Sequence, residues 1–133
     1  MSITREQVLA LFKPLEAGDP AAFFAHVAED VDWTVMGTHP LAGRYRSRAD
    51  FVRGTFARLA QALGQGARLV VTHVLVSGDW AVVELEAHAV AKSGLKFDNK
   101  YCWVMRFAQE KVVQVRAYLD SALVQRVIDE NPL

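Results

Sequence analysis

Three segments in the first half of the chain carry apolar residues at helical spacing. In the first, residues 3–17, apolar residues recur at i, i+3, i+4 and i+7, and Gly18 supplies a stop. The second begins with Asp19 in the N-cap position, followed by Pro20, whose missing N–H costs nothing in a first turn. The third follows Ser47 and Asp50, which match the capping-box spacing, and runs to about Leu63. The sequence therefore predicts three N-terminal helices.

Five other segments alternate apolar and polar residues with a period of two. "DVDWTVMG" lies between the second and third helices. From Arg68 onward come "RLVVTHVLVSG", "WAVVELEAHAVA", "FDNKYCWVMRFA" and "VVQVRAYL", joined by short turns that predict an antiparallel meander. After Asp120, "SALVQRVIDEN" returns to helical spacing. Helices segregated from strands predict an α+β fold, with three helices laid across one face of an antiparallel sheet and a short C-terminal helix.

Length and charge narrow the classes of function. We expect residues 1–133 to form a single domain, because this length can bury one self-sufficient core. Fifteen basic residues balance fifteen acidic ones, so nucleic acid is a poor partner. No apolar run is long enough for a membrane span, and the N-terminus shows no signal segment. We expect a cytoplasmic protein that does not act at a membrane.

The cysteine and the histidines argue against a metal site. Cys102 is a single cysteine and cannot close an intrachain disulfide, and the four histidines show no metal-ligand spacing. We therefore expect neither a metal nor another cofactor.

Strand parity places large rings opposite small side chains on the face turned toward the helices. Tyr101 and Trp103 share this face with Ala87, Ala89 and Ala117. Such a row of side chains can enclose a hollow. However, large side chains also face small ones in an ordinary, fully packed core. Asn99 has the same inward parity as Tyr101, and a buried amide or phenol needs polar partners. We interpret this as a wet or ligand-filled mouth at that end of the sheet.

Three stretches together resemble one known group of proteins: "LEAGD", "VDWTVMGTHPLAGRYRSRADF" and the final hairpin "YCWVMRF…KVVQVRAYLD". Their order resembles the nuclear-transport-factor-2-like, or ketosteroid-isomerase-like, superfamily, and within it the SnoaL-like (polyketide-cyclase-like) proteins. The resemblance covers essentially the whole chain. It implies a strongly curved sheet that forms a cone around a pocket, with helices closing one side. It also implies a homodimer that pairs through the outer sheet face, where Cys102, Val104 and Tyr118 lie among charged residues.

The catalytic residues of two well-known types within this superfamily are replaced here. The positions of the isomerase type fall on Thr34 or Val35, Leu11 and Trp103, and those of the epoxide-hydrolase type fall near Leu85, Ala87 and Ala117. None of these side chains can perform the corresponding acid/base step. The final hairpin therefore resembles a pocket wall more than a catalytic apparatus, and whether the protein is an enzyme stays open.

Three other residues are candidates for acid/base chemistry, each with a structural alternative. His39 lies on the loop after the first strand, where an imidazole could act as a general base or be a solvated loop residue. Asp120 matches the acid of the family's "Y.D" ending and also occupies an N-cap position. His73 either faces the enclosed side or lies outward on a bulged strand.

Two hypotheses of function follow. In the first, a small, mostly apolar molecule of polyketide, steroid or terpenoid type occupies the pocket and undergoes cofactor-free acid/base chemistry of isomerase, cyclase or hydrolase type. In the second, the chain is a non-enzymatic ligand-binding or assembly module. Both expect the ligand to contact one set of residues: Trp33, Val35, Tyr45, Phe56, Leu85, Asn99, Tyr101, Trp103 and Ala117.

Overall fold

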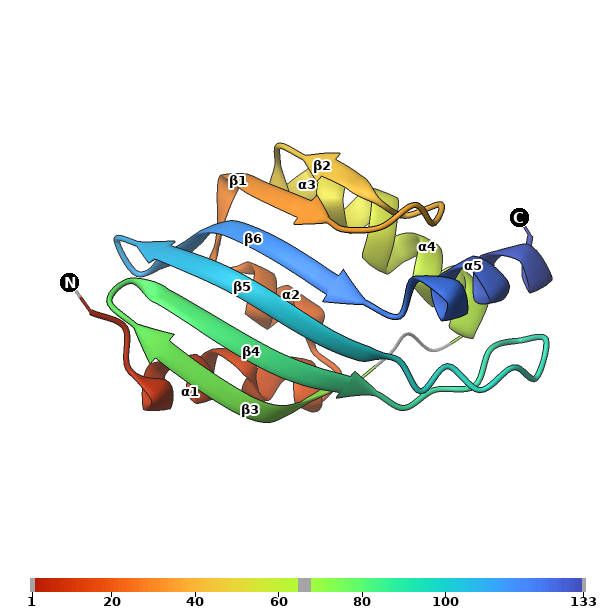
Figure 1. Cartoon of the computed structure of the whole chain (residues 1–133), viewed down its shortest axis with the longest axis horizontal. Helices are drawn as coiled ribbons and strands as arrows, with labels where there is room; N and C mark the ends of the chain where they lie inside the picture. The colour runs from red at the N-terminus through yellow and green to blue at the C-terminus, as the bar shows by residue number, and fades with distance from the viewer. Residues whose placement is uncertain (1, 65–67, 133) are drawn as a thin grey trace.

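The computed structural model describes residues 2–64 and 68–132 (Figure 1). Its helical elements are α1 (Arg5–Glu16), α2 (Pro20–Phe24), α3 (Arg48–Phe51), η1 (Val52–Phe56), α4 (Ala57–Leu63) and α5 (Ser121–Glu130). Its strands are β1 (Val27–Val35), β2 (Gly43–Tyr45), β3 (Leu69–Ser77), β4 (Trp80–Ala87), β5 (Lys100–Ala108) and β6 (Lys111–Leu119). The six strands form one curved sheet in the order β2-β1-β6-β5-β4-β3, and the helices before β3 lie on one side of it, which confirms the α+β fold.

The predicted helix starts are confirmed by their caps. Thr4 and Gln7 form a capping box before α1, the Asp19 carboxylate accepts the N–H of Ala22 (3.3 Å), and the Ser47 hydroxyl accepts the N–H of Asp50 (3.0 Å). These bonds satisfy donors that the first turn of a helix leaves free. Local chemistry therefore sets where each of these helices begins.

The third predicted helix is continuous from Arg48 to Leu63 but contains the π-helical turn η1. Gly54 lies in this turn against the ring of Tyr45, and a Cβ added at Gly54 would meet Cε1 of that ring at 2.6 Å. The absence of a side chain at Gly54 thus lets the helix lie directly on the ring from β2.

The sheet differs from a purely antiparallel one at β1. Strands β3, β4, β5 and β6 form the predicted antiparallel meander, whereas β1 pairs with β6 in parallel, with Trp33 beside Val115 and Val35 beside Ala117. The third helix and the strands β3, β4 and β5 lie between β1 and β6 in the sequence. This connection is long enough for β6 to run parallel to β1. The segment predicted as a loop also contains β2, which pairs with β1 through Trp33 and Tyr45.

The strands β4 and β5 are shorter than the alternation suggested. β4 ends at Ala87 and β5 begins at Lys100, so residues 88–99 form a connection that holds one isolated bridge between Val90 and Lys96. The prediction of regular strand through Ala91 and from Phe97 is therefore wrong. Ala91 and Phe97 lie within this connection and are buried, so their apolar side chains continue the alternation outside the regular strands.

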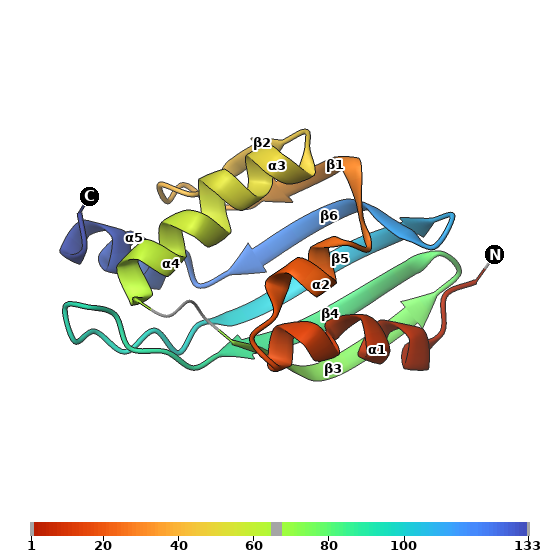
Figure 2. The same ribbon diagram turned by 180° about the vertical axis from the view of Figure 1, so that it is seen from behind.

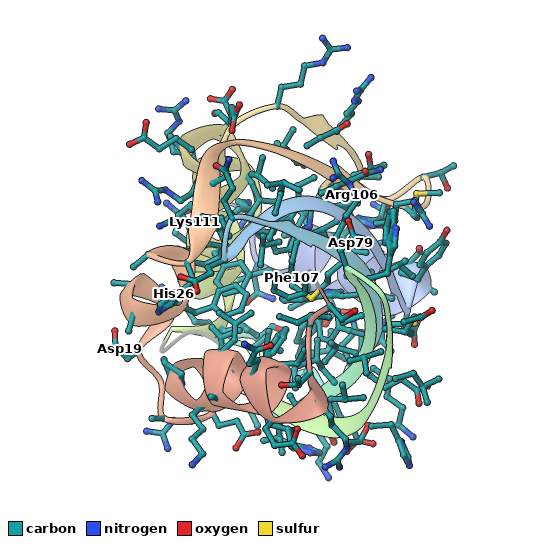
Figure 3. The ribbon with its side chains drawn as sticks, turned by 90° about the vertical axis from the view of Figure 1, so that its left-hand side faces the viewer. Asp19, His26, Asp79, Arg106, Phe107 and Lys111 are labelled. Carbon is teal, nitrogen blue, oxygen red and sulfur yellow. The ribbon has the colours of Figure 1, made fainter. Side chains whose placement is uncertain are left out.

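Two groups of helices cover the concave face of the sheet (Figure 2). α1 packs against β3 and α2, while α3 packs against β1 and β2. Where β6 begins, the Lys111 ammonium donates to the carbonyl of Ala25 (2.7 Å) and the N–H of Val112 donates to the carbonyl of His26 (2.9 Å), which joins the hairpin to the end of α2 (Figure 3). No helix within residues 2–64 and 68–132 is long and apolar enough to cross a membrane.

Candidate functional site

A cavity of about 1510 Å³ lies between the two helix groups and the concave face of the sheet. Its volume exceeds the roughly 300–1,000 Å³ that is typical of small-molecule sites, so a molecule of several rings would fit. Leu15 and Phe24 line it from the first helix group, the chain from Arg48 to Leu63 lines it from the second, and Tyr101 and Ala117 line it from the sheet.

The wall of the cavity is largely aromatic and held in place by ring–ring contacts. The rings are Phe24, Trp33, Phe51, Phe56, Tyr101 and Trp103. Trp33 stacks on Phe51 with centroids 3.9 Å apart, and Trp103 meets Trp33 edge-on at 5.2 Å. Rings fixed in this way present flat apolar surface to a ligand without losing further rotamer freedom on binding.

A small side chain maintains the space in front of the central strands. Ala117 on β6 lies in register between Val35 on β1 and Trp103 on β5, and all three line the cavity. Its methyl group cannot reach as far from the sheet as the side chains beside it.

Three residues predicted to contact a ligand do not line this cavity. Leu85 on β4 is 1% exposed and belongs to the buried hydrophobic core. Tyr45 packs edge-on against Phe51, and its hydroxyl donates to the carbonyl of Leu41 (2.8 Å). Both side chains therefore pack within the protein, and this geometry does not support their predicted contact with a ligand.

The third of these residues, Asn99, has the polar partners that its burial requires, but within the protein. Its Oδ1 accepts the N–H of Asp120 (3.0 Å), and its Nδ2 donates to the carbonyl of the same residue (3.4 Å). Asn99 is fully buried and joins the start of β5 to the start of α5. The inference of a wet mouth at Asn99 is thus replaced by a structural hydrogen-bond pair.

His39 does line the cavity, but both of its ring nitrogens are engaged. Nδ1 accepts the N–H of Leu41 (3.2 Å), and Nε2 lies 3.1 Å from the carbonyl of Met36, to which it donates. Burial lowers the pKa of this imidazole because the charged ring loses hydration. His39 thus holds the loop between β1 and β2 in its neutral form, and a general-base role would require one of these bonds to break.

The other two acid/base candidates lie away from the cavity. The Asp120 carboxylate accepts the N–H of Leu123 (3.1 Å) as the N-cap of α5, which is its structural alternative. The His73 side chain is 76% exposed, and its Nδ1 lies 3.3 Å from the carboxylate of Glu84 on the outer face. A register shift in β3 between Val71 and His73 turns His73 outward, which is the bulged-strand alternative and not the inward one.

Comparison with known proteins decides the family. The model of the SnoaL-like domain matches residues 8–115. The chain belongs to the SnoaL-like domain family. Among solved structures, it is similar to an NTF2-like protein from Burkholderia thailandensis, with 27% identity and a TM-score of 0.79 over 92% of this chain and 95% of that one. TerC, co-crystallised with polyporic acid, is 20% identical with a TM-score of 0.75 over 93% of this chain and 96% of TerC, which shows a shared fold.

Two curated relatives of this SnoaL-like domain are named dimerizing cyclases. phiC of a fungal species (strain ATCC 74256) is 29% identical over 98% of this chain and 59% of its own length. tstC of Talaromyces stipitatus is 25% identical over 86% of this chain and 53% of its own length. The chain therefore spans little more than half the length of these relatives.

The ionisable residues around the SnoaL-like cavity include several that sequence patterns did not single out. Arg48, Arg68 and His88 line it together with His39 and Tyr101, and none of the described lining residues is an aspartate or glutamate. Burial raises the pKa of the Tyr101 phenol strongly, so this group remains a neutral hydrogen-bond donor. In the alternating sequence "VVELEAHAVA", His88 has the outward parity of Glu84 and Glu86. β4 ends at Ala87, so His88 lies outside the strand and does not follow that parity.

The described residues hold no group of three or more side chains suited to a metal ion. What this arrangement can do chemically is enclose an apolar molecule, orient it and offer it hydrogen-bond donors.

Proposed function

We propose that the chain binds a small, mostly apolar molecule of polyketide type in the concave cavity and folds it for cofactor-free ring closure. The observation that carries this proposal is the cavity itself, of about 1510 Å³ and walled by six aromatic side chains. Two relatives named dimerizing cyclases support the reaction class, and the co-crystal of TerC with polyporic acid supports the binding of a small molecule by this fold.

The proposed contribution to ring closure is orientation rather than strong base catalysis. Holding two reacting atoms at van der Waals distance can supply several kcal/mol of a barrier, on the order of 7–11 in well-oriented cases. Tyr101 can donate a hydrogen bond to a ligand oxygen, because its phenol is neutral and none of the hydrogen bonds among the described residues involves it. A donor at an oxygen that gains negative charge stabilises the transition state for carbon–carbon bond formation at the neighbouring carbon.

A non-enzymatic ligand-binding module is the second candidate function. It is favoured by one observation, namely that no described lining residue is a carboxylate while both nitrogens of His39 are already bonded. Under this alternative, the same cavity retains its ligand unchanged.

Tryptophan fluorescence provides a direct test of ligand binding. Trp33 and Trp103 belong to the cavity wall, whereas Trp80 lies outside it under the guanidinium of Arg116. A Trp80→Phe variant therefore reports on the cavity alone. We expect saturable quenching by polyporic acid, which a Phe56→Ala change in the wall should weaken by about tenfold, since a large aromatic contact is lost. Absence of saturable quenching in Trp80→Phe would contradict the proposal.

Whether the protein also transforms its ligand is tested by mass spectrometry on its complex with a polyketide precursor. The cyclase proposal expects a bound polyketide precursor to change composition or ring count over time, and expects Tyr101→Phe to slow this change more than it weakens binding. A ligand that is recovered unchanged from the wild type would favour the binding module.

We further propose that two copies pair through the outer sheet face. Leu75, Val82 and Val104 form one row across β3, β4 and β5, and Leu75 is 70% exposed. Charged residues border this row, among them Glu84 and Arg116. An apolar centre with a charged rim of both signs is how specific interfaces are commonly built, and a two-fold axis would bring opposite charges together.

A further inference from the structure

The charged groups around the cavity are unbalanced in sign. The chain as a whole carries fifteen basic and fifteen acidic residues. Around the cavity, however, the described residues supply Arg48, Arg68 and His88 and no carboxylate. The excess of basic groups is therefore local to this site and not a consequence of composition. A cavity with low-dielectric walls and charges of one sign favours a ligand group of the opposite sign.

Arg68 is the basic group best placed to meet a ligand. It stands directly before β3 at the edge of the cavity, and its guanidinium lies over the backbone of Gly18. A Cβ added at Gly18 would come within 3.2 Å of Nε of Arg68, so the close approach depends on glycine. Within residues 2–64 and 68–132, no carboxylate lies at ion-pair distance from Arg68.

The two carboxylates on either side of Gly18 in the sequence, Glu16 and Asp19, have other partners. Glu16 Oε1 accepts the N–H of Val71 (3.2 Å), and the Asp19 side chain caps α2 through the N–H of Ala22. The guanidinium of Arg68 therefore keeps its donors for a group that enters the cavity.

The other basic groups are already committed within the protein. Nη1 of Arg48 donates to the carbonyls of Phe24 and Val27, both at 3.1 Å, and Nη2 lies 3.7 Å from Glu29. His88 lies between two carboxylates, with Nε2 3.4 Å from Glu86 and Nδ1 3.7 Å from Asp98. The guanidinium of Arg48 and the ring of His88 therefore already have partners within the protein, which leaves Arg68 as the positive end of the cavity.

We infer that the ligand is an apolar carboxylic acid, bound with its carboxylate on Arg68 and its body on the aromatic wall; this inference rests on the proposed function of the cavity. A guanidinium presents parallel N–H groups that match the two oxygens of a carboxylate. Phe24 belongs to the wall that the apolar body would meet. Arg68 is thus the residue that selects acids over neutral molecules of the same shape.

A matched pair of probes tests this selection. Anthracene-2-carboxylate and its methyl ester share one ring system and differ in charge, and their binding to the full chain can be followed by fluorescence anisotropy. We expect the acid to bind about tenfold more tightly than the ester, and the preference to shrink as salt is added, because Arg68 is exposed. Arg68→Gln should remove the preference and leave ester binding unchanged, whereas Arg68→Lys should retain part of it.

The control variant is Arg53→Gln. Arg53 is 74% exposed, pairs with Asp50 on the outside of the third helix and does not line the cavity, so its loss changes the net charge equally without touching the site. Equal affinity of wild type for acid and ester, or an acid preference that persists in Arg68→Gln, would overturn the inference while leaving the cavity's proposed function intact. Failure of both probes to bind would contradict the proposed function and the inference with it.

Discussion

The substitution Ala117→Leu tests whether the concave face encloses usable space. Ala117 is 2% exposed, lines the cavity and lies in register between Val35 and Trp103. Leucine adds three carbon atoms at this point. In a hollow, these atoms reach apolar surroundings without displacing neighbours, whereas in a solid core they force neighbours out of their rotamers.

The two cases differ in the sign of the change in the free energy of unfolding. Burial at about 0.8 kcal/mol per added carbon gives an upper limit of ~2.4 kcal/mol of stabilisation. The loss of leucine rotamer freedom reduces this by about 0.5–1 kcal/mol. We therefore expect Ala117→Leu to be between neutral and about 2 kcal/mol more stable than wild type. Overpacking of a filled core would instead cost about 1–3 kcal/mol.

Urea unfolding and a ligand titration read out both consequences. The added side chain should weaken binding of polyporic acid by at least about tenfold, because it occupies the space in front of Trp103. Ala108→Leu, at the exposed end of β5 and outside the cavity lining, is the matched control and should change neither quantity. A loss of 1 kcal/mol or more with ligand affinity unchanged would refute the reasoning.

Three further predictions follow from individual contacts. Because burial lowers the pKa of His39, the unfolded chain binds more protons below about pH 6.5, so the free energy of unfolding should fall as the pH drops below that value. Urea titrations at pH 7.5 and 5.5 should show a smaller pH dependence of the free energy of unfolding in His39→Gln than in wild type. His73→Gln, which changes an exposed side chain, should keep the pH dependence of wild type. Val104→Asp should convert a dimer into a monomer in sedimentation, and a wild type that is monomeric at micromolar concentration would rule out the proposed interface. Gly54→Ala should cost about 1–3 kcal/mol in thermal or urea unfolding, since the new methyl group meets the ring of Tyr45, and a double-mutant cycle with Tyr45→Ala should show coupling.

Local chemistry in the sequence determined the helix starts and the meander. The capping positions at Asp19, Ser47 and Asp120 are filled as their residue types predict, because a cap involves only neighbours three residues apart. Alternation with period two also placed Trp103 and Ala117 on the enclosed side, since that period follows from strand geometry alone. The three stretches "LEAGD", "VDWTVMGTHPLAGRYRSRADF" and "YCWVMRF…KVVQVRAYLD", taken together in their order, were enough to recognise the SnoaL-like family.

Only the tertiary structure decided the features that depend on distant partners. The parallel pairing of β1 with β6 joins segments separated by most of the chain, and alternation carries no information on which strand lies next to which. The outward turn of His73 follows from a register shift that reverses side-chain direction after Val71. Likewise, the ring of His39 is occupied by backbone groups of its own loop, a geometry that residue type does not reveal.

The residues that line the cavity were likewise predicted in part from the sequence and in part identified only from the tertiary structure. Parity placed Trp33, Val35, Trp103 and Ala117 on the enclosed side, where they line the cavity. It could not separate them from Leu85, which has the same inward parity but is buried in the core. Arg68 gave no sequence signal, because its place at the mouth depends on the approach of Gly18 from a different segment. Side-chain direction is a local property of the strand, whereas empty space and its charge arise only where separate elements meet.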